Sequence, residues 1–300
     1  MADFLQHVIN GISLGSIYAL IALGYTMVYG ILQFINFAHS DVYMVGAFIA
    51  YFVARAVGMT ESPGIETLVI LLGASMVGCA LLGVAIERLA YRPLRKAPKI
   101  NILITAIGMS LFLEYFGQVV FGADPKVFPS VLQDSVLFQM GTVPLKSLDI
   151  AVLGVTLVMM FALNFLIYHT KIGRAMRAVS TNMNVASLMG VNNDFIISFT
   201  FFVGSALAGA GSVLVGMKYP KIDPLMGMMI GLKAFVAAVL GGIGNIQGAV
   251  LGGLIMGLSE EMVVGYFSST YRDALAFGIL IVILIFRPAG LLGKYTVEKV

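Results

Sequence analysis

Long, uninterrupted apolar runs are the feature that most constrains the fold of this chain. Phe4–Tyr29, Ile65–Leu89 and Phe195–Met217 are each long enough to cross a lipid bilayer, which takes about 20 apolar residues in a helix. Only 11% of the residues are charged and 59% are apolar, against about 25% and 45–50% in soluble domains. A membrane barrel would instead show alternating strands of about 10 residues. We therefore predict an all-α fold, a polytopic membrane helical bundle.

Short polar stretches divide the apolar sequence into spans. The last part of the chain holds a Gly-rich region, Gly227–Phe267, with a polar interruption at Gly241–Gly248. The stretch before this interruption is short for a full crossing, so a broken or re-entrant helix fits it as well as a span. We expect about 8–9 transmembrane helices. Besides the runs above, the expected spans are Val42–Val57, Ile100–Gly122, Ile150–Tyr168 and Ala274–Phe286.

The positive charges indicate the orientation. Five cationic residues lie in the loop Arg88–Lys99, which the positive-inside rule places in the cytoplasm. Counting spans from this loop places the N-terminus and the longer loop Ala123–Leu148 outside. The tail with Lys294 and Lys299 is then cytoplasmic if Gly227–Phe267 crosses the membrane twice.

Glycine is unusually abundant, at 34 residues, and many glycines lie inside the apolar runs. Spacing of small residues by four lets two membrane helices approach closely. The alternative is that glycine is simply common in spanning helices. The pairs with this spacing are Gly11/Gly15, Gly204/Ala208, Gly248/Gly252 and Gly253/Gly257.

Several classes of chemistry are not indicated. The net charge of +3 comes from residues in short loops, so we expect no nucleic-acid partner. The one cysteine, Cys79, lies in an apolar run, which excludes an internal disulfide and a cysteine metal site. The sequence has neither an HExxH pattern nor a GxxxxGK[ST] loop, so the chain cannot bind ATP in the P-loop manner. We expect no catalytic residues, no metal and no cofactor.

Two interruptions suggest a transport pathway. Gly30–Asp41 lies near the start and Gly241–Gly248 near the end, and paired helix breaks of this kind point to a central path between two halves. Two ordinary loops are the alternative. Neutral amides in the breaks would form weak hydrogen bonds with a polar or zwitterionic solute and release it quickly. The candidate pathway residues are Gln33, Asn36, His39, Asn245 and Gln247.

Four ionisable residues lie within or beside apolar spans, where a charge is costly and needs a reason. Glu114, Lys233, Glu260 and Glu261 either pair with one another across helices or lie near an interface. Glu114 or Glu260 as a proton relay would instead indicate a secondary active carrier that works alone. The residues themselves leave both alternatives open.

The loop Lys171–Asp194 is basic, rich in alanine and predicted to be helical. Lys171, Arg174 and Arg177 lie at its start, and Gly190 is placed to end a short helix. Its interrupted apolar face comprises Ala175, Met176, Ala178, Val179, Ala186, Leu188 and Met189. A cytoplasmic segment of this kind predicts a docking surface for another subunit.

Five stretches together resemble the LivH-type permease family, the membrane subunits of bacterial ABC importers for branched-chain amino acids and related solutes. The likeness covers nearly the whole chain in the same order, although the family usually has Gly after NFAH, where this chain has Ser40-Asp41. Relatives in the broad family import urea or short amides. The stretches are Asn10–His39, Glu87–Arg95 (ERLAYRPLR), Gly173–Val191, Gly231–Gly253 and Phe286–Gly293 (FRPAGLLG).

The resemblance implies one permease domain, residues 1–300, in the bacterial inner (plasma) membrane among membrane lipid. It implies four partner subunits: a second LivM-like permease, two ABC ATPase subunits and a periplasmic substrate-binding protein. It also implies that the segment 171–194 couples ATP hydrolysis to transport. Its matching residues are Gly173, Arg174, Ala175, Arg177, Ala178, Ala186, Met189, Gly190 and Val191.

Overall fold

The computed structural model describes residues 2–59, 63–95, 97–140 and 143–293. Eight helices within these residues are long and apolar enough to cross a membrane, and a shorter apolar helix, Met226–Gly241, accompanies them. The predicted all-α membrane bundle with 8–9 helices is confirmed. The helices are α1 (Ala2–Leu32), α2 (His39–Val57), α3 (Ile65–Ile86), α4 (Lys99–Phe121), α5 (Ser147–His169), α6 (Lys171–Thr181), α7 (Met183–Leu188), α8 (Asn193–Lys218), α9 (Met226–Gly241), α10 (Ile246–Tyr266) and α11 (Arg272–Phe286).

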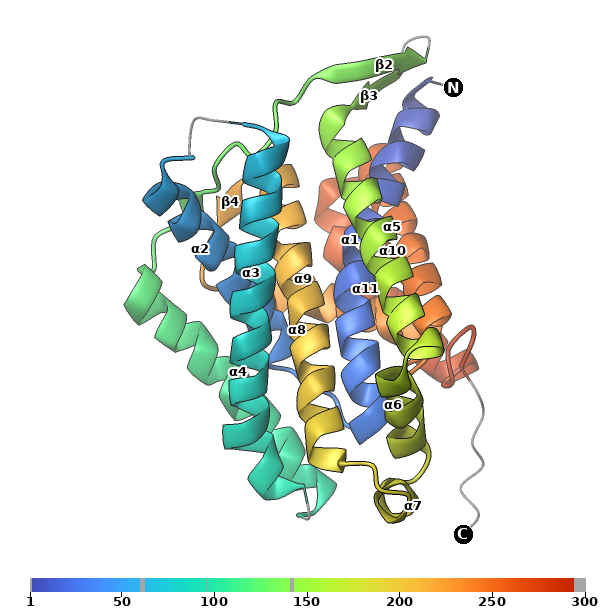
Figure 1. Cartoon of the computed structure of the whole chain (residues 1–300). Coiled ribbons are helices and arrows are strands. Elements are labelled where there is room, and N and C mark those ends of the chain that lie inside the picture. The colour runs from blue at the N-terminus through green and yellow to red at the C-terminus, as the bar shows by residue number, and fades with distance from the viewer. Residues whose placement is uncertain (1, 60–62, 96, 141–142, 294–300) are drawn as a thin grey trace.

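The long helices run between two ends of the molecule (Figure 1). The N-terminus lies at one end, where β2 (Val136–Met140) and β3 (Val143–Lys146) form an antiparallel hairpin. Helices α6 and α7 project at the opposite end. The second small sheet pairs β1 (Lys126–Val127) with β4 (Lys221–Ile222), and it joins the loop after α4 to the segment before α9.

Helix α1 is the centre of the bundle. In its most apolar window 94% of the residues are buried, against 22% in α4 and in α5 and 11% in the last helix. Glycines allow α10 to pack directly on α1, because a Cβ on Gly257 would lie 2.3 Å from the Cα of Gly15. A Cβ on Gly11 would likewise lie 2.9 Å from the Cα of Leu258. Here the predicted packing through small residues is confirmed.

Two helices begin inside the bundle instead of at one of its ends. Residues 33–38 are not helical, and α2 starts at His39, whose ring packs on the backbone of Gly24 in α1. Helix α9 starts beside the same point, because a Cβ on Gly231 would lie 2.1 Å from the Cβ of Ser40. The first turns of α2 and α9 therefore meet in the interior. Broken helices that meet in this way are typical of transporter binding regions.

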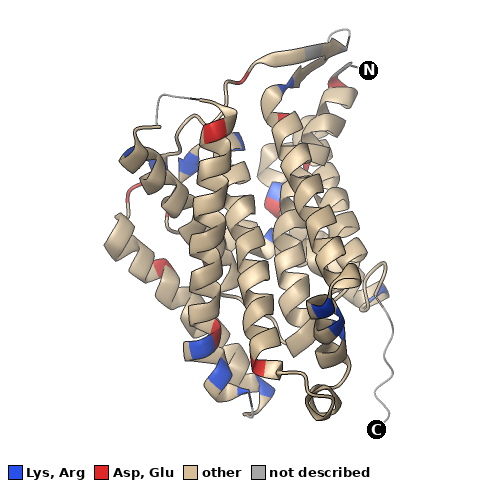
Figure 2. Cartoon of the chain, in the orientation of Figure 1, with Lys and Arg blue, Asp and Glu red and all other residues tan. Residues whose placement is uncertain are grey.

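Cationic residues gather mainly at the end that holds α6 and α7 (Figure 2). One group follows α3, in a π-helical turn (Glu87–Tyr91) and a 3₁₀ turn (Arg92–Leu94), and another begins α6. By the positive-inside rule this is the cytoplasmic end. Lys96, Lys294 and Lys299 lie outside the described residues.

Candidate functional site

Helix α6 is fixed against the end of α5. Thr170 caps it by accepting a hydrogen bond from the backbone N–H of Gly173 at 3.0 Å. Arg177 donates to the carbonyl oxygen of Ile167 at 2.7 Å, and its guanidinium lies 5.3 Å from the ring centre of Tyr168. Met176 is buried on the inner face of the helix. These contacts tie α6 to the end of α5.

Helix α7 is short and presents apolar side chains to the surroundings. Asn182 caps its start by accepting hydrogen bonds from two backbone N–H groups, and Gly190 ends it with a φ of 82°. The side chains of Leu188 and Met189 are 87% and 80% exposed. Large apolar side chains exposed together at a loop tip mark a contact surface. We call Val185, Leu188 and Met189 the α7 tip.

The predicted coupling residues divide into three groups by burial. Gly173 and Ala186 are buried, and Gly173 allows close packing because a Cβ there would lie 2.3 Å from two carbonyl oxygens of α5. Ala175 and Val191 are half-buried. The exposed members are Arg174, Arg177, Ala178, Met189 and Gly190.

The other end of the segment is tied to the turn after α3. Asp194, at the start of α8, accepts from Arg92 and, at 2.5 Å, from Arg95. Arg95 also pairs with the fully buried carboxylate of Glu87, which accepts from Ser198 at 2.6 Å. Four charged groups and a hydroxyl thus join α3 to α8 where the segment 171–194 ends.

Of the candidate pathway residues in the first interruption, only two are buried. Gln33 is exposed and has a φ of 53°, a conformation uncommon for a residue other than glycine. Asn36 accepts a hydrogen bond from Tyr91 at 2.6 Å. His39 is buried with its ring centre 4.7 Å from that of Tyr25, and neither ring nitrogen has a hydrogen-bond partner among the described residues.

The second interruption is a turn at the cytoplasmic end. Asn245 caps α10 by accepting from the N–H of Gly248, and its amide donates to the carbonyl oxygen of Leu292. Gln247 is exposed. The two interruptions lie side by side, since a Cβ on Gly30 would be 3.6 Å from the Cα of Gly244. A cavity of 160 Å³ lies between them and α6.

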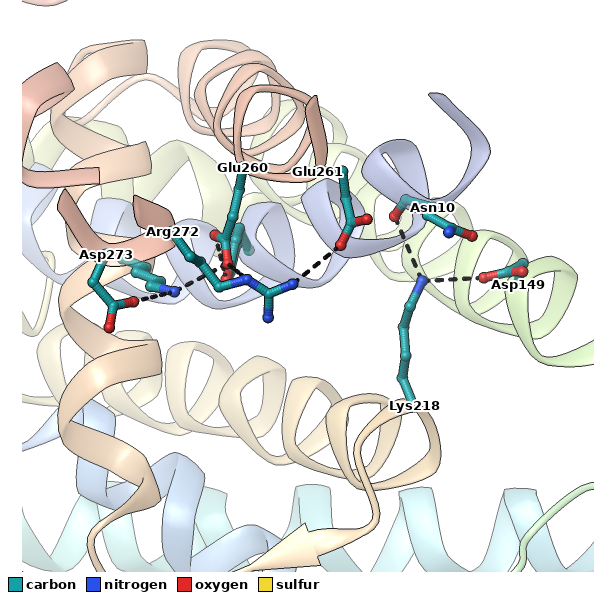
Figure 3. Close-up of polar contacts among 9 residues, drawn as sticks. Asn10, Asp149, Lys218, Glu260, Glu261, Arg272 and Asp273 are labelled. Carbon is teal, nitrogen blue, oxygen red and sulfur yellow. Dashed lines mark hydrogen bonds and ion pairs between the residues drawn. The ribbon is translucent and has the colours of Figure 1, made fainter. Parts of the chain in front are cut away.

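Three of the four ionisable residues belong to one ion-pair network (Figure 3). Glu260 accepts from Lys233 at 3.0 Å and from the hydroxyl of Tyr18 at 2.8 Å, and pairs with Arg272 at 3.0 Å. Lys233 also pairs with Asp273, and Arg272 with Glu261. The predicted pairing with one another across helices is confirmed for Lys233 and Glu260, whereas Glu261 pairs with Arg272, a residue that the prediction did not include. We call this set the ion-pair network; it joins α1, α9, α10 and α11.

A cavity of 540 Å³ lies at the N-terminal end. Lys218 bridges it by pairing with Asp149 at 3.1 Å, as Figure 3 shows. Burial raises the pKa of Tyr219 in its wall. At its rim a hydrogen bond to Asp134 raises the pKa of Lys146. These groups make this end of the molecule polar.

Glu114, the fourth residue, lies elsewhere. It lines a cavity of 250 Å³ between α2, α4 and α9, which we call the Asp41 cavity. Sequence reasoning did not identify this site. Two acidic residues signal it in the sequence: Asp41, shortly after NFAH, and Glu114, in the middle of a span. Their proximity, however, depends on how α4 packs. The cavity is lined by Tyr25, Phe37, Asp41, Ser110, Glu114 and Phe235 among others.

Known proteins are similar to this chain over nearly its whole length. The model of a family described as the permease component of branched-chain amino acid transport systems matches residues 7–284. The chain is 43% identical to the high-affinity branched-chain amino acid permease protein BraD of Pseudomonas aeruginosa, over 99% of this chain and 98% of that protein. It is 42% identical to the corresponding protein LivH of Escherichia coli K12, with the same coverage. A chain of the solved structure of PsaBC from Streptococcus pneumoniae with Fab superposes with a TM-score of 0.49 and 12% identity, covering 95% of this chain and 92% of that one.

Proposed function

Because the chain belongs to the family of branched-chain amino acid ABC transport permeases, we propose that it forms part of the membrane path of an importer for these amino acids or a related small polar solute. The observation that carries the proposal is the family match from residue 7 to residue 284. A permease component works within a larger transport system. The chain is thus one subunit of a multi-pass membrane assembly that includes other subunits.

The proposed assembly contains a second LivM-like permease, two cytoplasmic ATPases and a periplasmic substrate-binding protein. Residues 1–300 act as one permease domain, with 171–194 as the coupling segment. Exposed apolar side chains on the peripheral helices, such as Phe112 at 58% and Val119 at 83%, support contacts with membrane lipid or the second permease.

The α7 tip supports the coupling role. Closure of the ATPases on ATP would move this tip, and the segment passes the motion on through two anchors. One is the contact of α6 with α5, and the other is the Asp194 contact with Arg92 and Arg95. Rocking of the helices then opens the path on one side of the membrane at a time.

Transport itself is tested with the complete complex in proteoliposomes, with ATP supplied to the ATPases and radiolabelled solutes outside. We expect uptake of leucine, isoleucine or valine that needs ATP and the binding protein. Urea and acetamide belong in the same panel because the broader family includes importers of such solutes. Accumulation of solute by this chain alone under an ion gradient would instead establish a secondary carrier, although the two cations that hold Glu260 speak against a proton relay there.

Coupling is tested at the α7 tip. Leu188→Asp should reduce uptake and ATPase association by more than about tenfold, as expected for loss of an apolar hot spot. Val127→Asp is the matched control, because that side chain is 76% exposed and its strand β1 pairs with β4, which lies far from α7 (Figure 1). Ala178→Glu should reduce uptake in the same way. Normal uptake by both coupling variants would refute the docking role of the segment.

A further inference from the structure

The Asp41 cavity holds a carboxylate that has no cationic partner. Asp41 is 2% exposed, and among the described residues no lysine, arginine or histidine nitrogen lies within 4 Å of it or of Glu114. Its oxygen accepts from the hydroxyl of Ser110 and, at 3.4 Å, from that of Ser40. An acidic pair near the centre of a membrane protein without a countercharge is costly and marks a functional site.

The N-termini of two helices lie beside the Asp41 carboxylate. The residue lies in the first turn of α2, and a Cβ on Gly227 in the first turn of α9 would lie 3.1 Å from its Oδ1. Helix N-termini carry partial positive charge, so two of them lie beside this carboxylate. They offset part of its charge without occupying the cavity, which leaves the carboxylate available to a mobile cation.

The remaining wall is apolar and aromatic. The rings of Tyr25 and Phe37 lie 6.1 Å and 6.3 Å from the ring of Phe235, all on the cavity wall. The volume of 250 Å³ corresponds to about eight water molecules of 30 Å³ each, the size class of a small solute. Acidic groups on one side and aromatic rings on the other match a solute with an ammonium group and an apolar side chain.

The cavity reaches the side of the chain between α4 and α9. Its rim residues Ile107, Leu111 and Met228 are 45%, 47% and 57% exposed. Ser110 and Glu114 lie near the middle of α4, so the cavity is about halfway along the bundle. A second permease packed on this side would close it and place it between the two subunits.

From these observations we infer that the Asp41 cavity is a solute-binding station on the transport path, where Asp41 pairs with the ammonium group of the cargo. Ser110 holds the carboxylate in place, and Glu114 adds a second negative charge. The rings of Tyr25, Phe37 and Phe235 contact the aliphatic side chain of the cargo. This inference rests on the proposed function and adds the part of the solute that this chain recognises.

The transport test uses the assembled complex with Asp41→Asn and Asp41→Glu. The asparagine variant keeps the shape of the side chain and removes its charge, so leucine uptake should fall by about tenfold or more. ATP hydrolysis stimulated by the loaded binding protein should stay within about twofold of the wild-type rate, because the ATPases remain coupled. The glutamate variant should recover part of the uptake. Wild-type uptake by Asp41→Asn overturns the inference, and so does a parallel loss of uptake and ATP hydrolysis in both variants.

Binding is tested without transport by labelling a single cysteine. Cys79 is fully buried, so we expect no labelling of its thiol, and Ile107→Cys at the rim of the cavity supplies the reporter. A cationic, membrane-impermeant methanethiosulfonate should modify it in the complex, and millimolar leucine should slow the modification. 4-Methylpentanoate, which lacks only the ammonium group of leucine, should not. Equal protection by both solutes, protection by sodium ions alone, or no protection by either solute overturns the inference.

The two hypotheses fail in different ways. A wild-type complex that takes up no branched-chain amino acid refutes the proposed function. A wild-type complex that imports leucine, together with Asp41→Asn that imports it equally well, refutes only the assignment of the cavity.

Discussion

Two clusters of charged groups lie within the helical bundle, and they are built in opposite ways. In the ion-pair network, Glu260 and Lys233 have side-chain exposures of only 1% and 8%, and each is paired with an oppositely charged group. In the Asp41 cavity two carboxylates lie near each other and no cation faces them in the described part of the chain. The network contains its own countercharges, whereas the cavity has none among the described residues.

The comparison separates the charges of the ion-pair network, which hold helices together, from those of the Asp41 cavity, which we infer bind a solute. Pairing within the network joins four helices, and its buried members Glu260 and Lys233 each have an oppositely charged partner. An uncompensated carboxylate beside an open volume contributes nothing comparable to cohesion. It lowers stability, and functional sites commonly do so. Substitutions in the two clusters should therefore change stability in different ways.

The largest effect is expected in the network. Glu260→Gln removes the carboxylate shared by Lys233 and Arg272 and leaves both cations less compensated. Removing one partner of a buried ion pair lowers the free energy of unfolding by about 3–5 kcal/mol. We expect a strong loss of folded protein, measured by fluorescence-detected size exclusion after heating. Glu114→Gln is the matched control because Glu114 has no ion pair, and it should change stability by less than about 0.5 kcal/mol. Equal stability of the two variants would remove the distinction between the clusters.

The second-largest effect on stability is expected where α2 and α9, which border the Asp41 cavity, meet. In Gly231→Ala the new methyl group would lie 2.1 Å from the Cβ of Ser40, so α9 must shift away from Asp41. Overpacking of this kind costs about 1–3 kcal/mol, and we expect leucine uptake to fall as well. Gly73→Ala in α3 has open space around the new methyl group and should be neutral or stabilising. The prediction is checked by measuring thermal unfolding and leucine uptake of both variants.

A smaller effect of opposite sign is expected at Asp41. Asp41→Asn removes an uncompensated buried charge and keeps the hydrogen-bonding shape, so stability should stay equal or rise by about 1 kcal/mol. The same variant should lose leucine uptake. A melting temperature well below that of the wild type would mean that Asp41 holds the structure together as Glu260 does, and the contrast would fail.

The sequence predicted the helices better than it predicted the two clusters. Apolar length alone identifies the spans, and Gly190 ends α7 with the positive φ expected of a terminal glycine. The pairing of Lys233 with Glu260, 27 residues apart, depends on how three helices pack. The interior start of α9 depends on the contact of Gly231 with Ser40, which no local pattern encodes.

The candidate site shows the same limit. Asn245 is three residues before Gly248 at the start of a helix, and the capping pattern was a readable signal for the role it has in the structure. Because Asn245 is an amide in a glycine-rich break, the sequence analysis instead predicted a pathway role for it. In the sequence, Asp41 stands out only as part of a departure from the family pattern. Its lack of a countercharge becomes visible only when α4 and α9 are in place.

The smallest effect is expected for an ion pair outside both clusters. Lys146 and Asp134 are 47% and 41% exposed, and exposed pairs contribute about 0–1 kcal/mol. The hydrogen bond to Asp134 raises the pKa of Lys146. The stabilisation of the folded protein by this ion pair is therefore fully present below the ordinary lysine pKa of about 10.4. It is lost as the pH rises through the raised pKa of Lys146. We expect Lys146→Gln to lower the melting temperature slightly at pH about 8 and not at all once Lys146 has lost its proton. A loss as large as that of Glu260→Gln would show that exposure does not separate strong from weak pairs in this protein, and the contrast between the clusters would then need another cause.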